Sequence, residues 1–194
     1  MKKKLSSLLF ALATLFLLVG CGPDEFGIFW RPSGTAGIMV GNRDGGQYFI
    51  SSDEPYAVLI GNKTFLENGN AVDALVATSI ALTATQPLST SLGAGGACQA
   101  LLPTIDGDII PYSFSFSGAT PADSMISAMY QIHQQHGHLP WEKIVAPAEK
   151  LLRLGIPDNI AIQLQKDNPI WQYNEEGLII NPALAEAFST LRLR

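Results

Sequence analysis

The segment 71–85 constrains the fold more than any other part of the sequence. It contains no lysine or arginine, and it places small or apolar residues on every face of a helix. A helix of this kind is buried on most sides, and its small side chains let neighbouring backbones approach closely. Asn70 is placed to cap its N-terminus, Asp73 complements the helix dipole in the first turn, and Pro87 ends it. We therefore expect other elements to pack around this helix.

The other elements are predicted from capping residues, turn residues and hydrophobic periodicity. In chain order we expect a strand over 47–52, a helix over 55–67, paired strands over 96–104 and 109–117, a helix from 121 to about 136, a pair of short helices between 141 and 152, a helix over 159–166 and a helix from Pro182. Ser52 or Asp53 is expected to cap the first of these helices. The last one carries Leu184, Phe188 and Leu191 on one face, which needs a partner to pack against.

A loop of small residues, Ser89–Gly96, follows the central helix. Gly93 to Gly96 could suggest a phosphate-binding loop, but no lysine follows and a helix precedes it rather than a strand. Close packing between helix and sheet is the favoured role, because small residues fit where larger side chains cannot.

The N-terminus has the organisation of a secretory signal peptide over residues 1–20. Three lysines follow Met1, and the apolar run 8–19 is too short to span a bilayer comfortably. The run ends in Leu18-Val19-Gly20-Cys21, which resembles the bacterial lipobox, so Cys21 is expected to carry a lipid. Because Gly22 and not an aspartate follows Cys21, we expect an outer-membrane anchor facing the periplasm.

Residues 21–47 are rich in glycine and carry two prolines, which indicates a flexible tether between the lipidated cysteine and a folded body over 48–194. Removal of residues 1–20 takes three of the 12 lysines and arginines and none of the 17 acids, which leaves 9 against 17 and a net charge of −8. Nucleic acid is therefore not an expected partner. Cys98 lies in an apolar stretch, so we expect it to be a buried and unreactive thiol.

Several motifs in the same order resemble the gamma-glutamyltranspeptidases, also called glutathione hydrolases. The small-residue helix with its flanks, 69–74 and 87–96, is similar to the N-terminal signature of that family. The other matching segments are Ile50–Ser52 before Pro55, Gly137–Trp141 with Pro147–Ala148, and 177–191. The resemblance covers about residues 48–194 and only the opening part of the family's large subunit.

The resemblance implies the Ntn-hydrolase fold, a four-layer α/β/β/α sandwich, of which this chain holds an incomplete part. We expect an α+β structure made mainly of helices and one short β-hairpin. The resemblance also implies a precursor that cuts itself into two subunits, a threonine nucleophile freed at the new N-terminus, and hydrolysis or transfer of gamma-glutamyl groups such as that of glutathione. No cofactor is implied.

The sequence departs from the family at the position that holds the substrate. The large subunit of the family grips the substrate's α-carboxylate with an arginine in an R-E-x-A-P motif. Aligned on Pro121, that position holds Ser117, and no arginine lies between Arg43 and Arg153. A hydroxyl cannot replace a bidentate guanidinium, so Ser117 is the candidate substrate-binding residue with altered chemistry.

Other constellations carry weaker signals. His133 and His136 lie one turn apart, but no carboxylate or cysteine joins them and His138 at ligand spacing, so we favour solvated histidines over a metal site. Ser113 and Ser115 alternate with Ser117 along one strand face without a histidine at useful spacing, so no serine nucleophile is expected.

Two functional hypotheses remain open. In the first, this is the front piece of a gamma-glutamyltransferase-like lipoprotein, completed by a small-subunit portion that is encoded separately or missing through truncation, a split gene or a frameshift. No threonine here follows a recognisable self-cleavage site, so no catalytic residue is assigned to this chain. In the second, a catalytically inactive relative serves as an envelope binding or structural lipoprotein.

Overall fold

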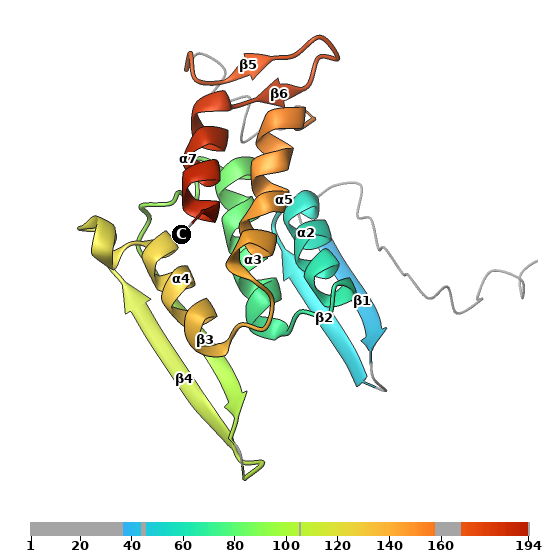
Figure 1. Cartoon of the computed structure of the whole chain (residues 1–194), viewed down its shortest axis with the longest axis vertical. Helices are drawn as coiled ribbons and strands as arrows, with labels where there is room; N and C mark the ends of the chain where they lie inside the picture. The colour runs from blue at the N-terminus through green and yellow to red at the C-terminus, as the bar shows by residue number, and fades with distance from the viewer. Residues whose placement is uncertain (1–36, 44–45, 105, 158–167, 194) are drawn as a thin grey trace, which may run out of the picture.

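The computed structural model describes residues 37–43, 46–104, 106–157 and 168–193. The fold is α+β, with helices in the middle and two-stranded antiparallel sheets around them (Figure 1). The elements are β1 (Gly37–Arg43), β2 (Gly46–Ser52), α2 (Pro55–Leu66), α3 (Ala71–Thr85), β3 (Gly96–Pro103), β4 (Ile109–Phe116), η1 (Pro121–Asp123), α4 (Met125–His136), α5 (Trp141–Leu154), β5 (Gln172–Tyr173), β6 (Ile179–Ile180) and α7 (Pro182–Arg192). None of the described helices is long and apolar enough to cross a membrane.

The helix α3 lies at the centre, as its small and apolar composition predicts. It begins after Asn70, whose side chain accepts the backbone N–H groups of Val72 and Asp73. Val76, Ile80 and other α3 residues on several faces are completely buried. The neighbouring helices α2, α4 and α5 pack around it. The predicted bounds and cap of this helix are confirmed.

The helix α2 packs closely along α3, and Gly61 makes this possible. A Cβ atom at Gly61 would collide with Thr78 Oγ1 of α3. The helix begins at Pro55 as predicted, but its cap is Glu54 and not Ser52 or Asp53, because Glu54 accepts the N–H of Ala57 at 2.9 Å and Pro55 occupies the first turn. It ends at Leu66, and Asn68 then adopts a left-handed conformation with φ 68°.

The strand β1 corrects the predicted boundary of the folded body. It pairs with β2 along its whole length, from Gly37 opposite Ser52 to Arg43 opposite Gly46. The folded body therefore begins no later than Gly37, inside the range expected to be a tether. The sequence has a signal for this hairpin, because the dipeptide Asp44-Gly45 favours a tight turn between two strands, but the predicted tether did not take it into account. Residues 1–36, with the predicted signal peptide and Cys21, lie outside the described part, as does the predicted helix 159–166.

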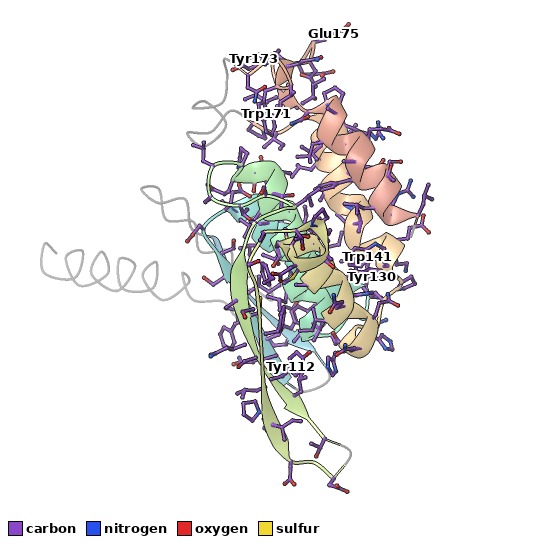
Figure 2. All side chains as sticks on the ribbon, turned by 90° about the vertical axis from the view of Figure 1, so that its left-hand side faces the viewer. Tyr112, Tyr130, Trp141, Trp171, Tyr173 and Glu175 are labelled. Carbon is purple, nitrogen blue, oxygen red and sulfur yellow. The ribbon has the colours of Figure 1, made fainter. Side chains whose placement is uncertain are left out.

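The predicted hairpin at 96–117 is confirmed as β3 and β4, which extend away from the helices (Figures 1 and 2). Phe116 at its base is buried against the core. Leu101 and Ile109, nearer the turn, are 73% and 67% exposed. Cys98 packs against the core but is half-buried rather than fully buried, and this burial raises the pKa of its thiol. A raised pKa leaves less thiolate, in keeping with the expected unreactive thiol.

Two predicted helices differ from the structure. The helix expected from 121 to 136 is interrupted at Ser124, whose extended backbone (φ −119°, ψ 164°) separates the short η1 from α4. The pair of short helices expected between 141 and 152 is one continuous helix, α5, with Pro147 inside it. Tertiary packing outweighs the lost hydrogen bond of Pro147, because α5 buries a full apolar face that includes Ile144 and Leu152.

The C-terminal helix α7 packs against α5, which supplies the partner that its apolar stripe requires. Phe188 is completely buried, and Leu184 and Leu191 pack against the same core. The indole N–H of Trp141 donates to the carbonyl of Leu191 at 2.8 Å. The short β5–β6 hairpin joins this pair through a bridge between Ile156 and Ile179.

An ion-pair network centred on Glu149 also joins α5 to α7. Its two carboxylate oxygens accept from Arg153 Nε and Arg192 Nε, each at 2.9 Å. Arg192 also pairs with Glu142 at 2.7 Å, and Arg153 with Glu186 at 3.3 Å. Glu149 is 8% exposed, so its two contacts are less screened by water than those of a surface pair.

We expect the substitution Glu149→Gln to lower the free energy of unfolding by about 1–2 kcal/mol, because it removes the charge that both arginines share. Chemical denaturation followed by circular dichroism measures this. The control is Glu175→Gln, which makes the same change at an exposed position near the β5–β6 hairpin (Figure 2). Equal losses in the two variants would show that the network does not stabilise the packing of α7.

Candidate functional site

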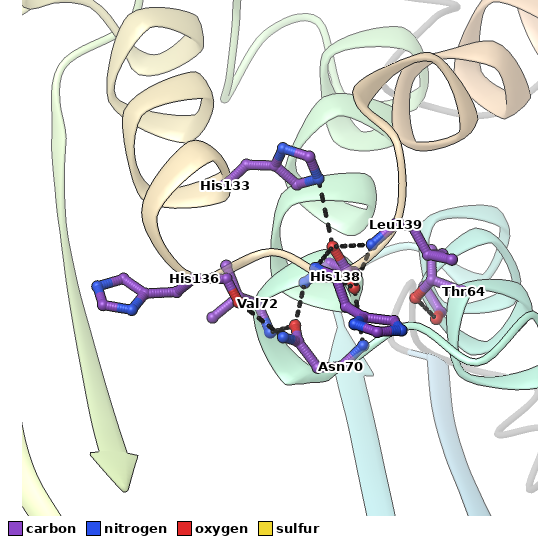
Figure 3. Close-up of polar contacts among 9 residues, drawn as sticks. Thr64, Asn70, Val72, His133, His136, His138 and Leu139 are labelled. Carbon is purple, nitrogen blue, oxygen red and sulfur yellow. Dashed lines mark hydrogen bonds and ion pairs between the residues drawn. The ribbon is translucent and has the colours of Figure 1, made fainter. Parts of the chain in front are cut away.

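Asp73 is the centre of a buried polar cluster at the start of α3, and Figure 3 shows its partners Asn70, His133, His138 and Leu139. Its side chain is completely buried. The carboxylate accepts backbone N–H groups from Asn70 at 2.8 Å, from His138 at 3.0 and 3.1 Å, and from Leu139 at 3.2 and 3.3 Å. His133 Nε2 of α4 lies 3.3 Å from Asp73 Oδ1. One carboxylate thus joins α3, the end of α4 and the connection that leads to α5.

The surroundings of Asp73 favour its ionised form. Burial by itself raises the pKa of the Asp73 carboxyl, but the contact with His133 and the backbone N–H groups of Asn70, His138 and Leu139 together outweigh that effect. The pKa of Asp73 therefore lies below its ordinary value.

The geometry of this cluster leaves no room for a substrate. The ring of His133 is 4% exposed and lies against Trp141, with ring centroids 5.2 Å apart. Gly137 covers the other part of the ring, since a Cβ atom there would lie 2.6 Å from His133 Cδ2. The histidine and aspartate therefore act as a structural clamp. The prediction of solvated histidines is wrong for His133, whereas His136 is half-buried and His138 is exposed.

Asp73 lies in the first turn of α3, where a carboxylate complements the helix dipole as predicted, but its structural role is wider. Its backbone partners at 138 and 139 lie 65 and 66 residues away along the chain. Periodicity and capping patterns describe neighbours within a few residues, so they could not identify these contacts. The sequence does contain one signal for this wider role: Asp73 is a single carboxylate in a helix whose other residues are small or apolar.

Ser117, the predicted substrate-binding residue, lies in the loop 117–123 between β4 and α4. Its hydroxyl donates to Asp123 Oδ2 and accepts the N–H of Ala119 at 3.1 Å. The N–H of Gly118 donates to the carbonyl of Asp123 at 2.7 Å. These bonds close the loop on itself and hold one carboxylate beside the serine. The sequence indicates Ser117 as a candidate but does not show that Asp123, six residues later, is its partner.

The 89–96 loop lies directly against the loop 117–123. Gly118 adopts φ 72°, and a Cβ atom on it would lie 2.7 Å from the carbonyl oxygen of Gly93. The carbonyls of Ala94 and Leu92 accept the first backbone N–H groups of α4, from Met125 at 2.9 Å and Ile126 at 3.1 Å. The glycines thus allow two loops to pack backbone to backbone and to cap a helix, rather than a helix to pack on a sheet.

The loop 117–123 also borders a small cavity of about 100 Å³ between β4 and α4. Tyr112, Phe114 and Phe116 line it from the strand, and Asp123 and Gln131 line it from the helical side. Within the described ranges, no lysine or arginine pairs with Asp123, and no three histidine, cysteine, aspartate or glutamate side chains lie close enough to hold a metal ion. The region around Ser117 is therefore acidic and partly aromatic.

Two known proteins that are similar to this chain are both named glutathione hydrolases. The chain is 27% identical over 129 residues to glutathione hydrolase 2 of Arabidopsis thaliana, which covers 55% of this chain and 22% of that protein. It is 27% identical over 204 residues to glutathione hydrolase proenzyme 2 of Schizosaccharomyces pombe, which covers 88% of this chain and 32% of that protein. No protein-family model matches the sequence.

A similar solved structure is the gamma-glutamyltranspeptidase from Pseudomonas nitroreducens complexed with L-DON. It has a TM-score of 0.60 and 21% sequence identity, and the match covers 79% of this chain and 56% of that chain. The chain thus spans a third or less of these two curated relatives and about half of the solved structure. It is a relative of the gamma-glutamyltranspeptidases over part of their length and shares their Ntn-hydrolase fold there.

We expect Asp73→Asn to lower the free energy of unfolding by about 3–5 kcal/mol at neutral pH, because it removes the charge that the buried N–H groups and His133 face. Thermal and chemical denaturation measure this loss. Asp53→Asn is the matched control, because Asp53 is exposed. A loss at Asp73 no larger than that at Asp53 would contradict the clamp.

The loss of stability in Asp73→Asn should also depend on pH. The pKa of Asp73 is lower in the folded chain than in the unfolded chain, so its ionised form stabilises the fold above the unfolded pKa of about 3.9. This contribution is lost as the pH falls through the lower folded pKa. The difference in stability between wild type and Asp73→Asn should therefore begin to shrink below about pH 4. A constant difference down to pH 2 would show that the charge of Asp73 is not responsible.

Proposed function

We propose that this chain is the N-terminal part of a gamma-glutamyltransferase or glutathione hydrolase-like envelope lipoprotein, active only when a small-subunit portion completes it. The observation that carries the proposal is the shared fold, together with the glutathione hydrolase relatives that match most of the described chain. The chain itself would contribute the central helix, the 89–96 loop and the loop 117–123. The nucleophilic threonine would come from the completing portion.

Ser117 supports a second candidate, a relative that has lost this activity and acts as a binding or structural lipoprotein of the envelope. At the position where the family resemblance implies an arginine, the chain has a hydroxyl that donates to Asp123. This pair supplies no positive charge for an α-carboxylate, and the carboxylate of Asp123 repels one. Gamma-glutamyl donors would therefore be bound weakly or in another way.

The proposal places the protein at the bacterial envelope through a lipid on Cys21, in the outer membrane and facing the periplasm. The support is the sequence alone, with a basic start, a short apolar run and Gly20 before the cysteine. Two or more acyl chains on Cys21 would make the anchor stable, since each buried methylene contributes about 0.8 kcal/mol.

We expect the purified chain to hydrolyse a chromogenic gamma-glutamyl anilide only when mixed with the product of the reading frame that follows it. Activity in the mixture and none in either part alone would support a completed enzyme. Ser117→Arg should then lower the KM for the anilide, because a guanidinium can bind its α-carboxylate. No activity in the mixture, with or without that substitution, would favour the inactive envelope lipoprotein.

We expect cells expressing the chain to incorporate radiolabelled palmitate into it, and Cys21→Ala to abolish the label and release the protein from the membrane fraction. Cys98→Ala is the control, because Cys98 is the other cysteine of the chain. Label retained in Cys21→Ala, or lost in Cys98→Ala, would rule out the lipid on Cys21.

A further inference from the structure

The cavity between β4 and α4 offers hydrogen-bond acceptors and a negative charge. Asp123 uses Oδ2 to accept from Ser117, and its Oδ1 has no bonded partner among the described residues. The hydroxyl of Ser124 donates its proton to Pro121, which leaves its oxygen as an acceptor. Gln131 directs its amide N–H₂ to Ser127 at 3.5 Å, so its carbonyl oxygen is free to accept. Asp123, Ser124 and Gln131 can therefore each accept a hydrogen bond from a ligand, and the hydroxyl groups of Ser115 and Tyr112, which also line the cavity, can accept as well.

The wall formed by β4 is aromatic. Phe114 and Phe116 lie with ring centroids 6.2 Å apart, and Tyr112 and Phe114 with centroids 5.8 Å apart. Aromatic ring faces attract cations, and the attraction increases when the cation is partly removed from water. Ile132, which is 2% exposed, closes the cavity on the α4 side.

Other charges do not oppose a cation at this place. No described lysine or arginine lines the cavity. The first two backbone N–H groups of α4 are bonded to the carbonyls of Leu92 and Ala94, so they are not directed at a ligand. A carboxylate ligand, in contrast, would meet the negative charge of Asp123 with no described lysine or arginine at the cavity to balance it.

We propose that this cavity binds the primary ammonium group of a small ligand. An ammonium group has three N–H donors, which match the acceptors of Asp123, Ser124 and Gln131. A volume of about 100 Å³ holds about three water molecules at the 30 Å³ each occupies in the liquid, so the ammonium group and a stem of two or three carbons fit. The proposal concerns equilibrium binding and does not depend on the gamma-glutamyl activity proposed above.

The test is a titration of the ¹⁵N-labelled chain with propylammonium chloride, followed by NMR. Its neutral analogue 1-propanol is titrated in parallel with sodium chloride added to equal ionic strength. We expect saturable shifts at Ser124, Gln131 and Ile132, with a Kd at least about tenfold lower for propylammonium than for 1-propanol. Asp123→Asn should reduce this preference to within about twofold.

Asp108→Asn is the matched control, because it removes the same charge at an exposed position in the hairpin turn, and it should leave the Kd within about twofold of wild type. Phe114→Leu, a second variant, should weaken propylammonium binding about threefold to tenfold and leave propanol binding unchanged. Shifts that do not saturate, an equal Kd for propanol, or an equal loss in Asp108→Asn would overturn the proposal. These results would leave the gamma-glutamyl proposal untouched, because no turnover is measured.

Discussion

One buried carboxylate holds the main helices in their arrangement. Asp73 joins the start of α3 to the end of α4 and to the residues before α5, through backbone N–H groups at 70, 138 and 139 and the ring of His133. These N–H groups are directed at the completely buried carboxylate of Asp73, so each would lose its acceptor if the carboxylate were removed. The packing of α5 on α3, and hence of α7 on α5, depends on this connection.

The stability of the two-stranded sheets depends on their packing against the helices. A hairpin alone is marginally stable in water, and each hairpin here buries a large apolar side chain in a core: Ile50 from β2, Phe116 from β4 and Ile179 from β6. The outer part of β3 and β4 keeps large apolar residues exposed, with Leu101 and Ile109 as examples. The helical centre is therefore the well-packed part of the described chain, and the sheets are attached to its periphery.

The chemistry of the loop 117–123 follows from the same close packing. Gly118 lets this loop lie on the 89–96 loop, and the resulting turn brings Asp123 back to Ser117. The serine is thus joined to a carboxylate and not to a positive charge.

The sequence by itself determined the bounds and cap of α3, the β3–β4 hairpin and the start of α7, because caps, turns and periodicity act between residues close in the chain. Only the tertiary structure decided that Asp73 binds the backbone at 138 and 139, that α5 continues through Pro147, that β1 belongs to the folded body and that Asp123 faces Ser117. Burial decides these features. Residues that are distant in the chain remove a charge or an N–H group from water, and a buried group of this kind is stable only when it has a partner.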